Sequence, residues 1–128
     1  MMEEQKKLIA EDWNEIKRLW ARDGLDADFD FQRACDLVWR NLESLGYTLE
    51  QAQVFVRDRE SFWLFVSDAR ERIMSGSRRL GTALIASHEK ADSGDLVSAR
   101  EILRSFVGSE TVGFYRELAE IELEGFET

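Results

Sequence analysis

The chain has 128 residues, of which 44% are hydrophobic and 34% are charged, and its formal net charge is −9. This balance indicates one globular helical domain over residues 1–128 rather than a disordered chain, and it argues against binding to nucleic acids or anionic membranes. The single cysteine excludes an internal disulfide, and the absence of proline favours helices throughout.

The N-terminal residues place acidic side chains before the lysines and contain no apolar core segment, so we predict no signal peptide. Nor do about 18 apolar residues run together anywhere, as a membrane-spanning helix requires. We therefore expect a cytoplasmic protein that does not enter membranes.

Apolar residues recur at helical spacing along nearly the whole chain. The first stripe predicts a helix that ends at Gly24, and its members are Ile9, Trp13, Ile16 and Trp20. A second stripe predicts a helix that ends at Gly46, and its members are Phe31, Cys35, Val38, Leu42 and Leu45. Next, Thr48 and Gln51 have the spacing of a capping box, which predicts a short third helix with Leu49, Ala52 and Val56.

The longest pattern begins near Ser61 and alternates steps of four and three residues, as a heptad-like seam does. It predicts one central helix of about thirty residues, or about 45 Å, whose seam consists of Phe62, Val66, Ala69, Ile73, Gly76, Leu80, Ala83 and Ser87.

Glycines and polar residues predict the ends of the remaining helices. We expect Gly94 to end the long helix in the left-handed conformation and Asp95 to cap the next one. That helix carries Leu96, Ala99, Leu103 and Phe106, and the last helix, beyond Gly108 and Ser109, carries Phe114, Leu118 and Ile121. The sequence thus predicts an all-α bundle of five or six helices with one long central helix.

The stretch GSRRLGT, residues 76–82, has the outline of a phosphate-binding loop. That motif needs a lysine after the second glycine and a preceding strand, and both are missing. Instead, Gly76 falls on the long seam with Ser75 and Ser77 beside it, which indicates a low surface where another helix can pack closely. We therefore assign Gly76 and Ser77 to helix packing, and Gly81, just off the seam, to a second contact.

The arginines of this region have two interpretations. Arg78 and Arg79, with Arg70 and Arg72 before them, could bind a partner or an anion, or could pair with the surplus carboxylates of neighbouring helices. Because guanidinium groups have abundant partners in an acidic protein, pairing is the favoured interpretation. Arg78 and Arg79 remain candidate partner-binding residues.

Few residues could support catalysis. The single histidine, His88, and the single cysteine, Cys35, cannot form a di-iron or zinc site with several such ligands. A Cys35–His88 nucleophilic pair is disfavoured because Cys35 belongs to an apolar stripe, where thiols are usually inert. On the last helix, Glu117, Glu120 and Glu124 share one face; we interpret it as solvated, with acid–base or cation-binding chemistry as the alternative. No catalytic residue, metal or cofactor is predicted.

The four tryptophans are expected to lie mostly in the core. Trp13 and Trp20 fall on the first stripe, whereas Trp39 and Trp63 lie off their stripes. A tryptophan at the surface is a common anchor of protein interfaces, so Trp39 and Trp63 are candidate partner-binding residues.

Two segments, RERIMSGSRRLGTAL and SGDLVSAREILRSFVGSETVGFYRELAEIEL, resemble the DUSAM domain, a small family expanded among myxobacteria. The resemblance is good over residues 70–124. The matching positions are Arg72, Ile73, Gly76, Ser77, Arg79 and Leu80, then Gly94, Asp95, Leu96, Ala99 and Arg100, then Tyr115, Arg116, Glu117, Ala119 and Glu120. Gly113 departs from the pattern, because the family has a proline there. The resemblance implies a bacterial helical domain and no known catalytic residue. Two interpretations are open for Tyr115, Arg116 and Glu117: they lock the last helix against the long one, or they face a partner. Arg116 and Glu117 therefore join the candidate partner-binding residues.

These observations lead to the hypothesis of a non-enzymatic protein-binding or regulatory module. One alternative is an immunity protein or antitoxin that neutralises a basic partner, to which the negative charge would steer it. A second alternative is an enzyme with a carboxylate site on the last helix, which would require Glu117 and Glu120 to converge with Arg79 or Arg116 in a pocket. Self-association at Gly76 is a further expectation.

Overall fold

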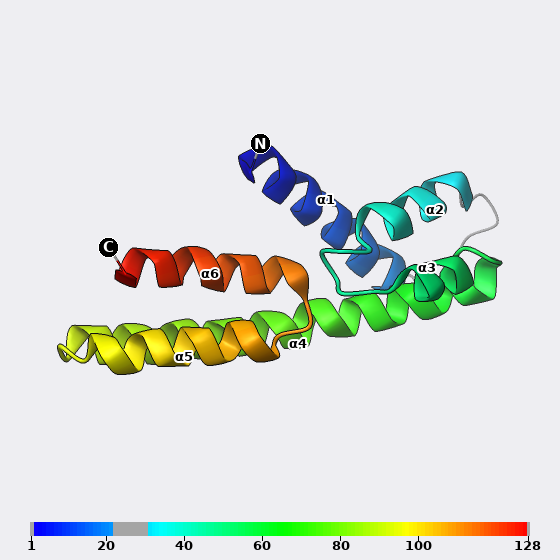
Figure 1. Cartoon of the computed structure of the whole chain (residues 1–128). Coiled ribbons are helices and arrows are strands. Elements are labelled where there is room, and N and C mark those ends of the chain that lie inside the picture. The colour runs from blue at the N-terminus through cyan, green and yellow to red at the C-terminus, as the bar shows by residue number, and fades with distance from the viewer. Residues whose placement is uncertain (1, 22–30, 128) are drawn as a thin grey trace. The chain divides into compact units, whose positions relative to one another are not determined.

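The computed structural model describes residues 2–21 and 31–127, and this part of the chain contains six α-helices. They are α1 (Met2–Ala21), α2 (Phe31–Arg40), α3 (Leu49–Phe55), α4 (Arg59–Asp92), α5 (Leu96–Ser109) and α6 (Gly113–Glu127) (Figure 1). The predicted all-α bundle with one long helix is confirmed. None of these helices is both long and apolar enough to cross a membrane.

The chain forms two compact units, an N-terminal unit (Met1–Ile73) and a C-terminal unit (Met74–Thr128). The long helix α4 contributes its first turns to the N-terminal unit and its later turns to the C-terminal unit. The organisation of residues 1–128 as one domain stays a prediction.

The seam predicted along α4 is the buried face of that helix. Seven of its eight members are buried, and only Ala83 is half-buried. In the N-terminal unit, Phe62 and Phe65 lie side by side with ring centroids 5.7 Å apart, and Phe65 also contacts Phe55 of α3. The heptad-like spacing therefore identified the residues around which both units are built.

Local sequence signals place several helix ends as predicted. Thr48 and Gln51 form the full capping box of α3, and Asp95 accepts a hydrogen bond from the Ser98 N–H at the start of α5. Gly94 has φ +89°, and the Asp95 N–H donates to the Lys90 carbonyl at 2.8 Å, so a Schellman motif closes α4.

The predicted end of the second helix is wrong, because α2 ends at Arg40 rather than at Gly46. The Asn41 side chain donates to the Leu37 carbonyl at 2.9 Å, so a side-chain hydrogen bond competes with the helical ladder there. The chain then continues in turns to Gly46, whose φ of 78° closes them. The side chain of Phe31, like Gly24 at the predicted end of the first helix, lies outside the described residues.

Two predicted faces are also shifted by one position. On α1 the buried residue after Ile16 is Leu19, and Trp20 is 38% exposed. On α6 the buried positions are Gly113, Tyr115 and Ala119 rather than the series Phe114, Leu118 and Ile121. Apolar residues stand at neighbouring positions in both helices, so spacing alone did not select the face, and packing against the rest of each unit did.

A buried polar network joins α1 to the end of α2. Asn41 accepts a hydrogen bond from the Trp13 indole N–H at 3.0 Å and donates to the Asp12 carboxylate at 3.0 Å. Asp12 is also held by Nε and Nη2 of Arg40, at 3.1 and 2.7 Å. Asn41 therefore hydrogen-bonds polar groups of both α1 and α2, and it fixes the orientation of one helix relative to the other.

In the C-terminal unit, Gly76 allows a close helix contact. A Cβ atom at this position would lie 2.6 Å from Cδ2 and Cε2 of Tyr115 on α6, and the Ser77 side chain hydrogen-bonds the Tyr115 hydroxyl. Gly76 and Ser77, for which the sequence predicts a helix-packing role, thus both lie against Tyr115 of α6. The second contact predicted for Gly81 is not found among the described residues, since no atom outside its own stretch of helix comes within 4 Å of where its Cβ would be.

Alanine substitutions at the two glycines of α4 test this contrast. We expect Gly76→Ala to lower the free energy of unfolding by about 1–3 kcal/mol, because the added methyl group overlaps the Tyr115 ring. Gly81→Ala should raise it by up to about 1 kcal/mol, because alanine is the better helix former and the space is open. Urea unfolding of both variants in dilute solution measures the difference, and equal effects would contradict the assigned packing.

Replacing Asn41 tests the polar network in the N-terminal unit. Asn41→Ala leaves the Trp13 N–H and the Asp12 carboxylate short of partners in a buried site, so we expect a loss of about 2–3 kcal/mol of stability. Asn14 is exposed on the same α1 helix, and Asn14→Ala should change stability by less than about 0.5 kcal/mol. Thermal unfolding followed by circular dichroism compares the two, and a tolerated Asn41→Ala would overturn the role of the network.

Candidate functional site

An open groove of about 590 Å³ lies on the N-terminal unit. Its walls come from Trp20 of α1, from Gln51 and Phe55 of α3, and from a face of α4 that includes Leu64 and Asp68. Leu64 is 62% exposed there, although a leucine of an amphipathic helix normally faces the core. We call this feature the α1/α3/α4 groove.

Arginines fix two walls of the α1/α3/α4 groove. The Arg70 guanidinium lies 3.8 Å from the centroid of the Trp20 ring, a cation–π contact that holds this tryptophan at the surface. Arg72 donates to Asp68 at 2.9 Å and to the carbonyls of Leu45 and Gly46 at 3.0 and 3.2 Å, so it ties the turn before α3 to α4.

Tyr47 does not line the groove, but from its buried position it supports the wall that Asp68 and Arg72 form. Its hydroxyl donates to the same Asp68 oxygen that Arg72 contacts, and the Arg72 guanidinium lies 4.0 Å from the centre of its ring. Burial, and then the hydrogen bond to Asp68, raise the pKa of the Tyr47 phenol well above its usual value. The phenol therefore stays protonated and acts as a fixed hydrogen-bond donor, which makes this wall preorganised.

The two tryptophans predicted to bind a partner have different surroundings. Trp39 is 43% exposed on α2, whereas Trp63 is half-buried on α4. The exposed tryptophan that lines a groove is Trp20, which the sequence analysis placed in the core. No signal in the sequence distinguishes it, because Leu19 beside it is equally apolar and helical spacing alone does not select which of the two faces the core.

The C-terminal unit brings together Arg79 and Arg116 around a residue that the sequence analysis did not select, Glu110. The Glu110 carboxylate is 1% exposed and accepts two hydrogen bonds from Arg79, at 2.9 and 2.7 Å. It also accepts the N–H groups of Thr111 and Val112, while Arg116 donates to its carbonyl at 3.2 Å.

The position of Glu110 between two helices explains this arrangement. The helix dipole disfavours a negative charge at the C-terminus of α5 and favours one near the N-terminus of α6. The Glu110 side chain accordingly points toward the N-terminus of α6, where it accepts the Val112 N–H. Burial alone raises the pKa of Glu110, but the bonds from Arg79 and from the Val112 and Thr111 N–H groups outweigh it, and the pKa lies below its usual value. Glu110 thus joins α4 to the α5–α6 turn as a structural anion.

The predicted pairing of the four arginines with carboxylates is partly confirmed. Arg72 and Arg79 form ion pairs, with Asp68 and Glu110 respectively, and Arg70 stacks on Trp20. The guanidinium of Arg78 makes no hydrogen bond or ion pair with any residue in the described ranges, and it is exposed.

The carboxylate alternative on α6 finds no support in the contacts. Glu117, Glu120 and Glu124 are all exposed, and no ion pair within residues 2–21 and 31–127 joins them to Arg79 or Arg116. No group of three or more His, Cys, Asp or Glu side chains in that part of the chain could hold a metal ion.

Cys35 and His88 show no sign of activation. Burial raises the pKa of the Cys35 thiol, which is the opposite of what a nucleophilic cysteine needs. His88 forms an ion pair with Glu122 of α6 through Nε2 and lies against the Phe126 ring, with centroids 5.4 Å apart. These contacts hold the ends of α4 and α6 together.

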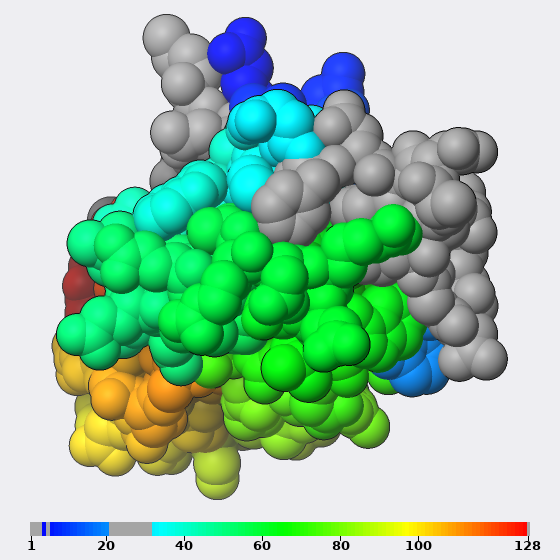
Figure 2. All heavy atoms as spheres, turned by 90° about the vertical axis from the view of Figure 1, so that its right-hand side faces the viewer, coloured from blue at the N-terminus to red at the C-terminus, as the bar shows by residue number. Residues whose placement is uncertain are grey.

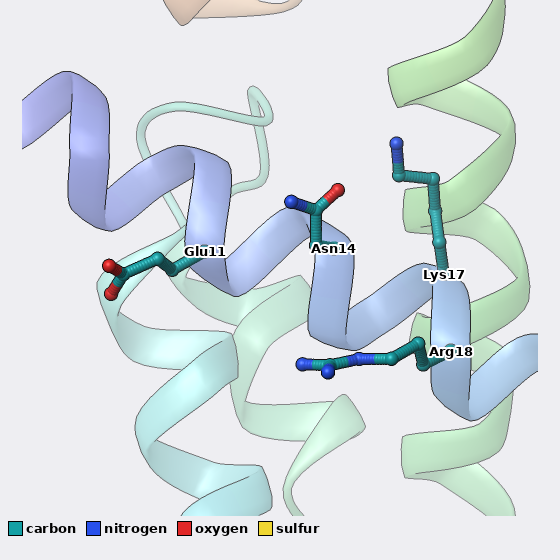
Figure 3. Close-up of a pocket in the computed structure, with 4 residues that line it drawn as sticks. All are labelled: Glu11, Asn14, Lys17 and Arg18. Carbon is teal, nitrogen blue, oxygen red and sulfur yellow. The ribbon is translucent and has the colours of Figure 1, made fainter.

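A second open pocket, of about 570 Å³, is lined by Glu11, Asn14, Lys17 and Arg18 of α1. Figure 3 shows that these four side chains spread in different directions instead of converging on a common point. Within the described ranges the lining comes from this single helix, which supplies no opposing wall to hold a ligand.

The buried ion pair of Glu110 predicts a pH-dependent stability. A carboxyl whose pKa is lowered by folding stabilises the protein above its unfolded pKa, and this contribution is lost as the pH falls through the folded pKa. We expect Glu110→Gln to lower stability at pH ~7 by about 1–3 kcal/mol and to remove this part of the acid dependence.

The matched control is Glu127→Gln, because Glu127 pairs with Arg104 in an exposed ion pair that contributes at most about 1 kcal/mol. Urea unfolding between pH ~7 and ~3 measures both variants. If Glu110→Gln retained the acid dependence of the unmodified protein, the assigned role of Glu110 would be wrong.

Comparison with known proteins extends the sequence evidence at the level of the family. No curated protein and no solved structure matches the chain. A family model described as "Protein of unknown function (DUF2379)" matches residues 11–126, which covers nearly all of both units, from the middle of α1 to the end of α6. The chain therefore belongs to this family of proteins of unknown function.

Proposed function

We propose that the chain is a non-enzymatic, cytoplasmic protein-binding module and that the α1/α3/α4 groove receives an apolar side chain of a basic partner protein. The observation that carries this proposal is the 62% exposure of Leu64 in the groove, next to Trp20, which is 38% exposed. Full burial of a leucine side chain stabilises a complex or a core by about 1.5–3 kcal/mol. Because Leu64 is mostly exposed, it contributes little of this stabilisation to its own unit, and a partner that covers it would gain it.

The architecture of the groove supports a protein ligand. Figure 2 shows the start of α4 in green beside α3 in blue-green, so the two helices form one continuous surface on this face. Trp20 and Leu64 supply apolar anchors, and Arg70 and Arg72 surround them with charged groups already held in place. Aromatic and arginine side chains around an apolar centre are typical of protein interfaces.

The charge of the chain supports a basic partner. A net charge of −9 attracts a positively charged protein from a distance and accelerates its association, whereas it repels nucleic acids and anionic membranes. Neutralisation of a basic toxin would be one form of this activity. The resemblance to the DUSAM domain is compatible with the family match over residues 11–126 and supports a bacterial source.

An aspartate in place of Leu64 tests the proposal. Leu64→Asp should weaken binding of the partner by about 10-fold or more, because it removes the apolar anchor and buries a charge in the interface. Val97→Asp is the matched control, because Val97 is 63% exposed but lies on α5 of the C-terminal unit. Neither change should alter thermal stability, since both side chains are exposed.

The measurement has two steps. Proteins captured from the native cells by the unmodified chain, Leu64→Asp and Val97→Asp are compared by mass spectrometry, and the candidate is then purified and titrated against all three at low and moderate salt. We expect one stoichiometric basic protein that binds the unmodified chain and Val97→Asp alike, with association slowed by salt. A partner that binds Leu64→Asp equally well, or no protein that distinguishes the variants, would refute the proposed groove.

A further inference from the structure

One face of α4 in the C-terminal unit is exposed or half-exposed along its length. Met74, Arg78, Gly81, Ile85 and Glu89 follow one another at steps of three and four residues, so they share this face. Ile85 is 64% exposed and Met74 is 39% exposed. We call these five residues the outer α4 face.

Gly81 distinguishes the outer α4 face from an ordinary solvated helix surface. A glycine in a helix interior lowers stability relative to alanine, and such a residue usually allows another group to approach the backbone. At Gly76 that group is Tyr115, but at Gly81 no atom of the described residues outside the neighbouring turns of α4 lies within 4 Å of the Cβ position. The packing of the described residues therefore gives no reason for this glycine.

The charges of the outer α4 face identify what covers it. Arg78 and Glu89 are exposed, and neither side chain has a hydrogen bond or ion pair with any residue that the structure describes. They are separated by eleven residues, or about 16 Å along the helix, which is too far for them to pair with each other. Arg78 and Glu89 have opposite charges. Two copies of the outer α4 face can therefore form two ion pairs, each between Arg78 of one copy and Glu89 of the other.

We propose that the outer α4 face binds a second copy of the chain in an antiparallel arrangement. A two-fold axis at the level of Ala83 and Leu84 places Arg78 of each copy opposite Glu89 of the other. The same register places each Ile85 opposite the low surface at Gly81 and Thr82 of the partner. A parallel pair would instead place Arg78 against Arg78 and Glu89 against Glu89, which like-charge repulsion disfavours.

This proposal changes the place at which self-association was predicted from the sequence. Gly76 is filled by Tyr115 and is unavailable to another copy, whereas Gly81 and Ile85 are accessible. The proposal is also independent of the α1/α3/α4 groove, because all its residues belong to the C-terminal unit.

Variants that reverse the charges of Arg78 and Glu89 give the sharpest test. Sedimentation velocity of the full chain over a series of concentrations measures the dimer Kd of each variant. We expect Arg78→Glu and Glu89→Arg each to raise the dimer Kd by about 10-fold or more, because each creates two like-charge pairs across the axis. The double variant Arg78→Glu/Glu89→Arg should restore the original Kd, since the pairs are re-formed with reversed signs. An equimolar mixture of the two single variants should form a mixed dimer.

Two further variants separate the apolar contact from the charges. Ile85→Asp should raise the dimer Kd by about 10-fold or more, whereas Val97→Asp, at an equally exposed residue of α5, should leave it unchanged. Circular dichroism should show the same thermal stability for the charge-exchanged chains as for the unmodified one. The proposal is overturned if the unmodified chain sediments as a monomer up to about 1 mM, if the single variants associate normally, or if the double variant does not recover.

Discussion

Burial of one seam along α4 is the interaction on which both units depend. In the N-terminal unit this seam supplies Phe62, Val66 and Ala69 to the core, and in the C-terminal unit it supplies Gly76 and Leu80. Most of the stability of a helix in a protein comes from packing of its apolar face, so the 34 residues of α4 depend on this seam. The alternation of large side chains with small ones lets other elements come close, as the Tyr115 ring does above Gly76.

Buried polar residues fix how the shorter helices pack within each unit. Asn41 holds Trp13 and Asp12 of α1 at the point where α2 ends, and Glu110 holds Arg79 of α4 at the turn between α5 and α6. Both are located at helix ends, where backbone groups lack helical partners. Because no buried side-chain polar atom among the described residues is left without a partner, these networks specify one packing of each unit at little energetic cost.

Against this well-satisfied interior, the exposed apolar residues require a different explanation. Leu64 and Ile85 are each exposed by more than three-fifths, on two units of the same protein, and both stand beside charged groups whose positions are defined. Asp68 and Arg72, which Tyr47 supports through its hydrogen bond to Asp68, lie in the groove with the first, and Arg78 and Glu89, whose side chains form no ion pair among the described residues, share a helix face with the second. Both proposals place another molecule over these residues, because burial of exposed apolar side chains stabilises a complex.

The sequence by itself determined the helical class, the long seam of α4, the capping box at Thr48, the ends marked by Gly94 and Asp95, and the packing role of Gly76. Each depends on neighbouring residues of one helix or turn, whose spacing and backbone preferences are visible in the chain. Only the tertiary structure decided that Trp20 and not Leu19 faces outward, that Asn41 meets Trp13 and Asp12 of α1, and that Glu110 meets Arg79. Those outcomes depend on which groups other helices bring within a few ångströms, and contacts between residues far apart in the chain leave no periodic signal in the sequence.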